Sequence, residues 1–100
     1  MKKILFICLL VSLSFGKDIE WMKYKEGLLN NNDKPIFYVL SASYCIFCKR
    51  DIKMMNENPT LKKYIEDNFV NIYEERDVEN VPSYLDQMIT PVYYVLDADG

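Results

Sequence analysis

With 100 residues, 50% of them hydrophobic and 27% charged, the chain has the size and composition of one small globular domain, which excludes a disordered or collagen-like polypeptide. Twelve Lys and Arg against fifteen Asp and Glu give a net charge of −3 at pH 7, so the basic surface of a nucleic-acid-binding protein is absent. The sequence contains no histidine, which excludes Ser-His-Asp and Cys-His catalysis and the zinc and haem sites that use His ligands.

The beginning of the chain has the pattern of a cleavable secretory signal peptide. Lys2 and Lys3 are followed by an apolar run over residues 4–13 and then by small residues before the predicted cut. The apolar run is shorter than the roughly 20 residues that a membrane-spanning helix needs, so a permanent anchor is the weaker interpretation. We therefore expect removal of residues 1–16, which leaves residues 17–100 as one periplasmic or otherwise exported domain without stable membrane insertion.

Downstream of this segment, apolar runs and turn-forming residues predict helices between strands. The predicted elements, in chain order, are a helix from about Ile19 to Leu29 capped by Asp18, a strand over 36–40, a helix that begins near Cys45, a helix that begins at Asn58-Pro59, a strand over 69–73, a solvated loop over 74–79, a short helical piece over 80–87 and a strand over 92–96. Strands that alternate with helices predict an α/β sheet with crossover connections.

The last four residues, 97–100, are Asp-Ala-Asp-Gly, which is typical of a hairpin turn. A hairpin turn leads into a further strand, and the sequence stops before one. The pattern therefore predicts a truncated chain rather than a natural terminus.

Residues 45–48, Cys-Ile-Phe-Cys, follow the first predicted strand and open a helix. Signal removal takes away Cys8, so Cys45 and Cys48 are the two cysteines of the expected mature domain. On the first turn of a helix, residues i and i+3 lie close enough for a disulfide, and the free N–H groups and helix dipole favour a thiolate. We expect Cys45 to be the exposed nucleophile and Cys48 to be the resolving thiol that attacks the mixed disulfide from inside.

A cysteine pair also has other uses. A structural zinc site needs four ligands, and c-type haem attachment needs a His after the second Cys, where this sequence has Lys49. A disulfide that closes so short a loop constrains little of the unfolded chain, which disfavours a purely structural bond. Two thiolates can hold Cu(I), so a Cu(I)-binding or non-catalytic binding module stays open beside the redox interpretation.

The sequence resembles the thioredoxin superfamily in three stretches. Residues 34–40 have the Lys-Pro start and apolar run of the strand before the active site, and residues 41–49 carry an aromatic before the first Cys and a Lys after the second. Thr90-Pro91 precedes a further apolar strand and the turn at residues 97–100. The chain looks most like the exported proteins related to the periplasmic C-terminal domain of the transmembrane thiol:disulfide interchange reductase.

The resemblance implies a thioredoxin-like fold, a central mixed β-sheet flanked by helices, from which the family's last strand and helix are missing. It implies that Cys45 and Cys48 are the catalytic redox pair and that no dissociable cofactor is needed. Pro91 matches the family's cis-proline, which faces the pair and leaves the backbone of Thr90 free to bind an extended substrate. Tyr44 matches the aromatic residue that shields the disulfide.

The implied reaction is thiol-disulfide exchange on protein cysteines, with electrons supplied by a membrane-borne donor. The dipeptide Ile46-Phe47 between the cysteines is apolar and offers no His to stabilise a thiolate, which favours the reductase or isomerase direction over a disulfide-donating oxidase. Many thioredoxins have a buried acid at the position that Val39 takes here. We expect this departure to slow turnover.

Overall fold

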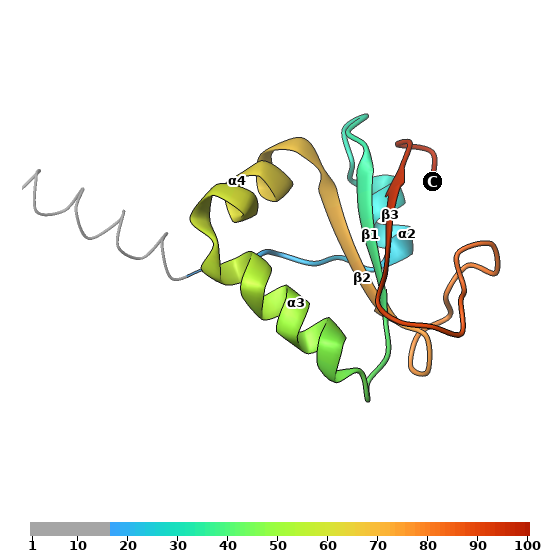
Figure 1. The fold of residues 1–100 in the computed structure, drawn as a ribbon. Helices are drawn as coiled ribbons and strands as arrows, with labels where there is room; N and C mark the ends of the chain where they lie inside the picture. The colour runs from blue at the N-terminus through green and yellow to red at the C-terminus, as the bar shows by residue number, and fades with distance from the viewer. Residues whose placement is uncertain (1–16) are drawn as a thin grey trace, which may run out of the picture.

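The computed structural model describes residues 17–100, so the predicted signal peptide at residues 1–16 lies outside the described residues. The described chain forms a three-stranded sheet flanked by helices (Figure 1). The central strand β1, Ile36–Ser41, pairs in parallel with β2, Val70–Glu75, and antiparallel with β3, Val92–Leu96. This architecture confirms the predicted α/β class with a central mixed sheet, and it is compatible with a thioredoxin-like fold.

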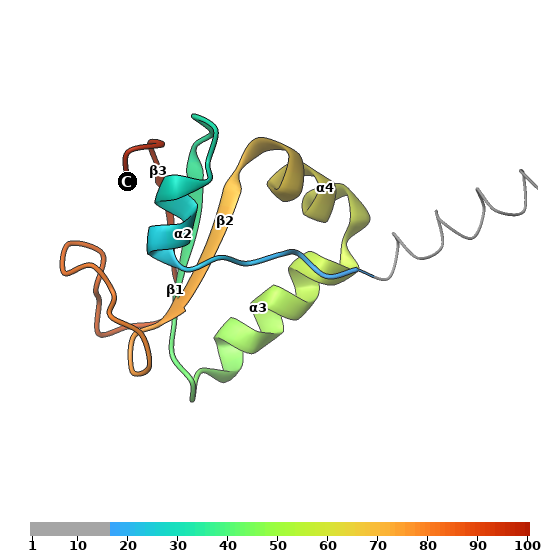
Figure 2. The same cartoon turned by 180° about the vertical axis from the view of Figure 1, so that it is seen from behind.

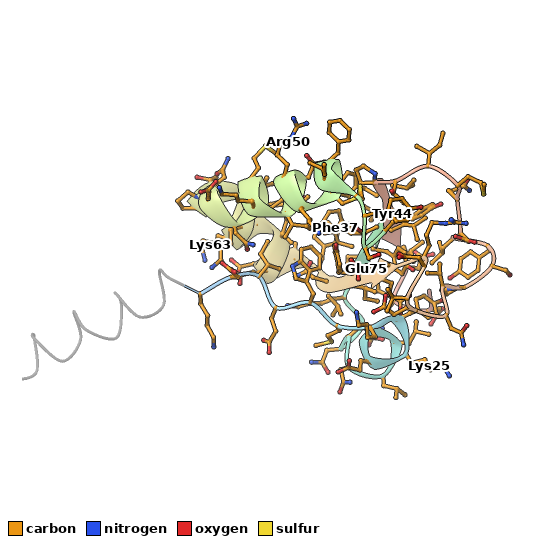
Figure 3. The ribbon with its side chains drawn as sticks, turned by 90° about the horizontal axis from the view of Figure 1, so that it is seen from below. Lys25, Phe37, Tyr44, Arg50, Lys63 and Glu75 are labelled. Carbon is orange, nitrogen blue, oxygen red and sulfur yellow. A yellow bond between two sulfur atoms is a disulfide. The ribbon has the colours of Figure 1, made fainter. Side chains whose placement is uncertain are left out.

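Helices cover both faces of the sheet. Helix α2, Tyr24–Leu29, packs on one face, and α3, Ile46–Glu57, and α4, Pro59–Asn68, pack on the other (Figure 3). Alternate side chains of β1 face different layers, so Tyr38 joins the core on the α2 side and Phe37 packs on the α3 side. A strand covered on both faces has to be apolar along its length, which explains the unbroken apolar run of β1. None of the helices within residues 17–100 has the length and apolar character to cross a membrane.

The larger core lies between the sheet and α2. Its buried members are Ile36, Tyr38, Leu40, Ile72 and Leu85, all at most 2% exposed. Complete burial of one such aliphatic side chain contributes roughly 1.5–3 kcal/mol to folding. Leu85 comes from the long connection between β2 and β3, so its burial holds that connection against the sheet. A smaller core of Ile19, Met55 and Ile65 lies under α3 and α4.

The predicted first helix, from about Ile19 with Asp18 as its cap, begins too early. Residues 17–23 are extended, and α2 begins at Tyr24 with Lys23 in the N-cap position. Figure 2 shows the extended segment running from α2 across β2 toward α3 and α4.

Tertiary contacts explain why this segment stays extended. The Met22 backbone pairs in parallel with β2 through hydrogen bonds of 2.8 and 3.1 Å. The extended backbone also lets Trp21 pack against Phe37, with ring centroids 6.2 Å apart. Trp21 and Tyr24 thereby reach opposite faces of the sheet, whereas a helix would place both side chains on one face.

Helices α3 and α4 meet at Asn58, as the Asn-Pro pair predicts. The Asn58 side chain accepts a hydrogen bond from the Leu61 N–H at 3.1 Å, and Pro59 takes the first helical position, where no N–H is needed. Asn58 thus ends α3 and begins α4.

The predicted short helix over residues 80–87 does not form. Residues 76–91 are an irregular connection with turns, in which the Leu85 N–H donates to the Pro82 oxygen at 3.0 Å. Leu85 is the one buried side chain of this connection, and its carbonyl accepts from the Tyr94 hydroxyl at 2.9 Å. One buried apolar residue is too little to stabilise a helix of this length.

Glu74 does not belong to the solvated loop that the sequence predicts. It lies in β2 and is only 4% exposed. Its carboxyl group accepts hydrogen bonds from the Tyr38 hydroxyl at 2.8 Å and from the Tyr24 N–H at 3.1 Å. These bonds satisfy the buried oxygens and join the start of α2 to the sheet.

The buried hydroxyl of Tyr38 predicts a loss of stability at alkaline pH. Burial, and then the hydrogen bond to Glu74, raises the pKa of Tyr38 far above its ordinary value of 10.0. Below pH 10 both the folded and the unfolded chain keep this proton, and above pH 10 the unfolded chain releases it first. The free energy of unfolding should therefore fall by up to about 1.4 kcal/mol per pH unit above that pH on account of Tyr38.

Urea unfolding measured from about pH 8 to pH 11 checks this expectation. In the Tyr38→Phe variant, the free energy of unfolding should fall less steeply with pH above pH 10, because the contribution of about one proton is removed. The control is Tyr64→Phe, at a tyrosine that is 58% exposed, and it should keep the wild-type slope. Equal alkaline slopes in wild type and Tyr38→Phe would contradict the account.

Candidate functional site

The two cysteines form a disulfide where β1 leads into α3. Cys45 is the N-cap residue of α3, and its sulfur accepts a hydrogen bond from the Cys48 N–H at 3.1 Å. The two Cα atoms are 5.3 Å apart, within the ordinary range for a disulfide. The preceding turn is closed by the Cys45 N–H, which donates to the Ala42 oxygen at 3.0 Å. The Cys-x-x-Cys spacing therefore gives the bonded pair that the sequence predicts.

Both sulfurs of the oxidised pair are shielded from solvent. Cys48 is 0% exposed and Cys45 is 7% exposed, so Cys45 is more covered than the sequence analysis expects. The reason is local packing, because the two cysteines and Ala42 form a small buried cluster. Cys45 is the more exposed of the two cysteines.

Exposed apolar side chains surround the disulfide. Tyr44 is 68% exposed, Ile46 78% and Phe47 60%. The Arg50 guanidinium lies over the Phe47 ring, 5.1 Å from its centroid. We call Tyr44, Ile46 and Phe47 together the apolar rim of the disulfide.

Thr90 and Pro91 lie at the same end of the sheet as the disulfide. The peptide bond between them is cis. The next residue, Val92, pairs with Leu40 in the antiparallel register of β1 and β3. Pro91 therefore stands beside the end of β1 that leads to Cys45.

Two charged residues that the sequence analysis did not identify, Arg76 and Asp77, contact segments on both sides of the site. The Asp77 carboxylate accepts from the Ser43 N–H at 2.8 Å and from the Ser43 hydroxyl. The Arg76 guanidinium donates to the Asp86 carboxylate at 2.9 and 3.4 Å. Arg76 and Asp77 belong to a charged stretch typical of a solvated loop, and only the fold brings their partners close.

These contacts shift both pKa values. The Ser43 hydroxyl first, and then the Ser43 N–H, lowers the pKa of Asp77. The hydrogen bond to Asp86 raises the pKa of Arg76, and the Tyr44 hydroxyl raises it further. Asp77 and Arg76 therefore stay charged at neutral pH, so the hydrogen bonds of Asp77 with Ser43 and of Arg76 with Asp86 are kept.

On the α3 side of the sheet, two hydroxyl groups near the site are hydrogen-bonded to each other. Ser41 is fully buried, and its hydroxyl is hydrogen-bonded to the Tyr73 hydroxyl at 2.8 Å. Val39, at the position where many thioredoxins have an acid, is also fully buried. Ser41 and Tyr73 thus supply one hydrogen-bonded pair in this region, whereas the Val39 side chain has no hydrogen-bonding group.

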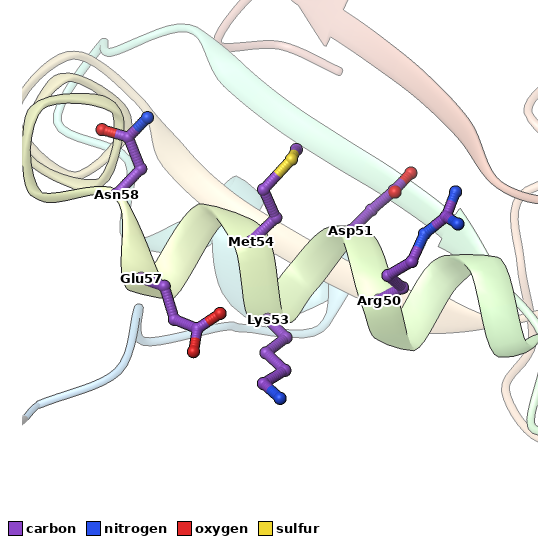
Figure 4. A pocket seen from close by; sticks show the side chains of 6 residues that line it. All are labelled: Arg50, Asp51, Lys53, Met54, Glu57 and Asn58. Atoms are coloured by element: carbon purple, nitrogen blue, oxygen red, sulfur yellow. The ribbon is translucent and has the colours of Figure 1, made fainter.

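Two hollows border α3. One of about 210 Å³ is lined by Trp21, Lys49, Ile52 and Tyr73. The other is open and is lined by Arg50, Asp51, Lys53, Met54, Glu57 and Asn58 (Figure 4). Neither hollow is lined by a cysteine.

Within the part of the chain that the structure describes, no three His, Cys, Asp or Glu side chains come together as a metal-binding group. No family model matches the sequence, and a search of curated proteins finds no match. The thioredoxin resemblance therefore rests on the sequence motifs, the mixed sheet and the Cys45–Cys48 disulfide.

Proposed function

We propose that this protein is an exported thiol-disulfide oxidoreductase that acts on protein cysteines. The observation that carries the proposal is the Cys45–Cys48 disulfide at the N-terminus of α3, directly after the central strand of a mixed sheet. At this place, free backbone N–H groups and the helix dipole stabilise a thiolate on Cys45 once the pair is reduced. The disulfide itself is the redox group, and the reaction needs no dissociable cofactor.

In the reductase direction, the reduced protein reacts in two exchange steps. The Cys45 thiolate attacks one sulfur of a substrate disulfide, and a mixed disulfide forms while one substrate thiolate leaves. Cys48 then loses its proton and attacks the Cys45 sulfur, which releases the second substrate thiolate. The substrate gains two electrons from the protein and two protons, one released by Cys48 and one from solvent, and the protein ends as the Cys45–Cys48 disulfide.

The residues around the pair suit a polypeptide substrate. Tyr44 is exposed beside the disulfide, and we assign it to the apolar contact with the substrate. Thr90, before the cis bond to Pro91, presents its backbone to an extended substrate segment. These roles agree with the apolar rim, since a small polar disulfide gains little from such a surface.

The proposal includes a location and an electron donor. The pattern of residues 1–16 supports export, which places the domain where protein disulfides form and persist. A reductase in that compartment needs a source of electrons from across the membrane, and a membrane-borne dithiol protein is the partner that we propose. The net negative charge of the chain offers no attraction to nucleic acid.

Turnover of a protein disulfide tests the proposal. The assay follows dithiothreitol-driven reduction of insulin, with protein whose reduced cysteines have been alkylated as the matched control. The unmodified protein should accelerate the reaction above dithiothreitol alone, and the alkylated protein should not. Equal rates for both samples would contradict the proposal, and thiol-dependent binding of one Cu(I) without turnover would replace it by a metal-binding function.

A further inference from the structure

The turn after β2 places two consecutive charged side chains, Arg76 and Asp77, against segments that are far apart in sequence. Asp77 contacts the turn that leads into Cys45, and Arg76 contacts the connection that leads to Thr90. These two segments carry the disulfide and the cis bond, so the turn joins the two sides of the proposed site.

Asp77 holds the segment in front of the nucleophile. Ser43 stands two residues before Cys45, and it is exposed. Its N–H and its hydroxyl both donate to the Asp77 carboxylate, the N–H at 2.8 Å. A carboxylate that accepts two hydrogen bonds from one residue fixes both the position and the orientation of that residue.

Arg76 holds the segment on the other side of the proposed site, which leads to Thr90. Its guanidinium donates to both oxygens of Asp86, at 2.9 and 3.4 Å, and approaches the Met88 sulfur at 3.8 Å. Met88 and Ile89 are 83% and 77% exposed, so they gain little support from the core. Leu85 anchors this connection in the core, and the forked contact of Arg76 to Asp86 adds a second hold closer to Thr90.

The turn that carries both residues is itself firmly attached. The Arg76 N–H donates to the Ser41 oxygen at 2.9 Å, which continues the pairing of β2 with β1. The Glu75 oxygen accepts from the N–H groups of Val78 and Glu79 at 3.0 and 2.8 Å, which closes the turn. Arg76 and Asp77 thus project from a support that does not depend on either segment they hold.

We propose that Arg76 and Asp77 are positioning residues that set the spacing between the Cys45–Cys48 pair and Thr90–Pro91, and we call the space between these two segments the opening. This inference rests on the proposed function, because it concerns the geometry in which a substrate disulfide meets Cys45. A polypeptide substrate needs both sides of the opening, since it reacts at one side and lies along the other. A small disulfide needs only the cysteine side. A change at Arg76 should therefore affect the polypeptide substrate alone, whereas a change at Asp77 should affect both substrates.

The test compares insulin with bis(2-hydroxyethyl) disulfide as substrates of the full chain. Arg76→Gln should raise the KM for insulin by about threefold or more, leave kcat within about twofold, and leave the rate with the small disulfide unchanged. Asp77→Ala should lower kcat about tenfold with both substrates, because it frees the turn that carries Cys45. Asp77→Asn should restore most of this rate, since an amide oxygen still accepts from the Ser43 N–H and the amide NH₂ can donate to the Ser43 hydroxyl.

Matched controls come from α4, where Lys63 and Asp67 form an exposed ion pair with a 2.9 Å contact. Lys63→Gln and Asp67→Ala remove the same charges and should leave all rates at the wild-type level. Thermal unfolding of each variant shows whether it is folded. If wild type reduces insulin while Arg76→Gln and Asp77→Ala behave like these controls, the positioning role is wrong and the proposed function stands. If wild type reduces neither substrate, both proposals fail.

Discussion

Replacement of Cys45 by Ser should reduce catalysed disulfide exchange to the background rate, a loss of about three orders of magnitude or more. A serine hydroxyl is not ionised at neutral pH and forms no bond to sulfur under these conditions, so the first exchange step has no nucleophile. Cys45 is also the partner nearer to solvent, at 7% exposure against 0% for Cys48, so Cys48 cannot replace it without a rearrangement of α3. The measurement is the initial rate of insulin reduction with dithiothreitol as the electron source.

The matched variant is Cys48→Ala, which keeps the nucleophile and removes the resolving thiol. It should also lose most of its turnover, and when the pre-reduced variant is mixed with substrate without dithiothreitol it should accumulate a covalent mixed disulfide, visible as a band on a non-reducing gel. Cys45→Ser should give no such band. If Cys45→Ser traps the substrate and Cys48→Ala does not, the two roles are exchanged, and if both variants keep wild-type rates, the pair is not the site of the reaction.

The second large effect is expected at Glu74, where replacement by Ala should cost about 3 kcal/mol of folding stability. The change leaves the buried Tyr38 hydroxyl and the Tyr24 N–H without the oxygens that accept from them at 2.8 and 3.1 Å. It also leaves a cavity beside the core in which Tyr38 is fully buried. For a domain of this size, such a loss corresponds to a fall in Tm of roughly 12–24 °C.

Two variants separate this explanation from a general effect of charge. Glu74→Gln keeps one oxygen for the Tyr38 hydroxyl but turns an amide NH₂ toward the Tyr24 N–H, so it should lose an intermediate amount of stability. Glu66→Ala removes an exposed carboxylate that lies 3.4 Å from Lys62 and should change the free energy of unfolding by less than about 0.5 kcal/mol. The explanation is wrong if Glu74→Ala is no more destabilising than Glu66→Ala in thermal unfolding.

The parts of this fold that sequence predicts well are those with local causes. The apolar run of β1 predicts a strand covered on both faces, and Asn58-Pro59 predicts a helix start because the cap and the missing N–H act within one turn. The spacing of Cys45 and Cys48 predicts their disulfide for the same reason, since both lie on one turn of α3.

The parts that sequence misses depend on contacts between distant residues. The sequence predicts a helix that begins at about Ile19, yet pairing of Met22 with β2 and packing of Trp21 on Phe37 keep residues 17–23 extended. Glu74 stands at the start of a charged stretch, and its burial is explained by hydrogen bonds from Tyr38 and Tyr24, which are 36 and 50 residues away. Asp77 is recognised as part of the site only when the fold places Ser43 beside it.

The reduction potential of the Cys45–Cys48 couple tests the proposed function most directly. The protein is equilibrated in glutathione or dithiothreitol buffers, free thiols are alkylated, and the oxidised fraction is read from the mass shift. We predict one reversible two-electron couple at roughly −270 to −200 mV, where a reductase fed by an upstream dithiol works. A couple near about −120 mV would identify a disulfide donor and contradict the reductase direction, and the absence of any reversible couple would contradict the redox function itself.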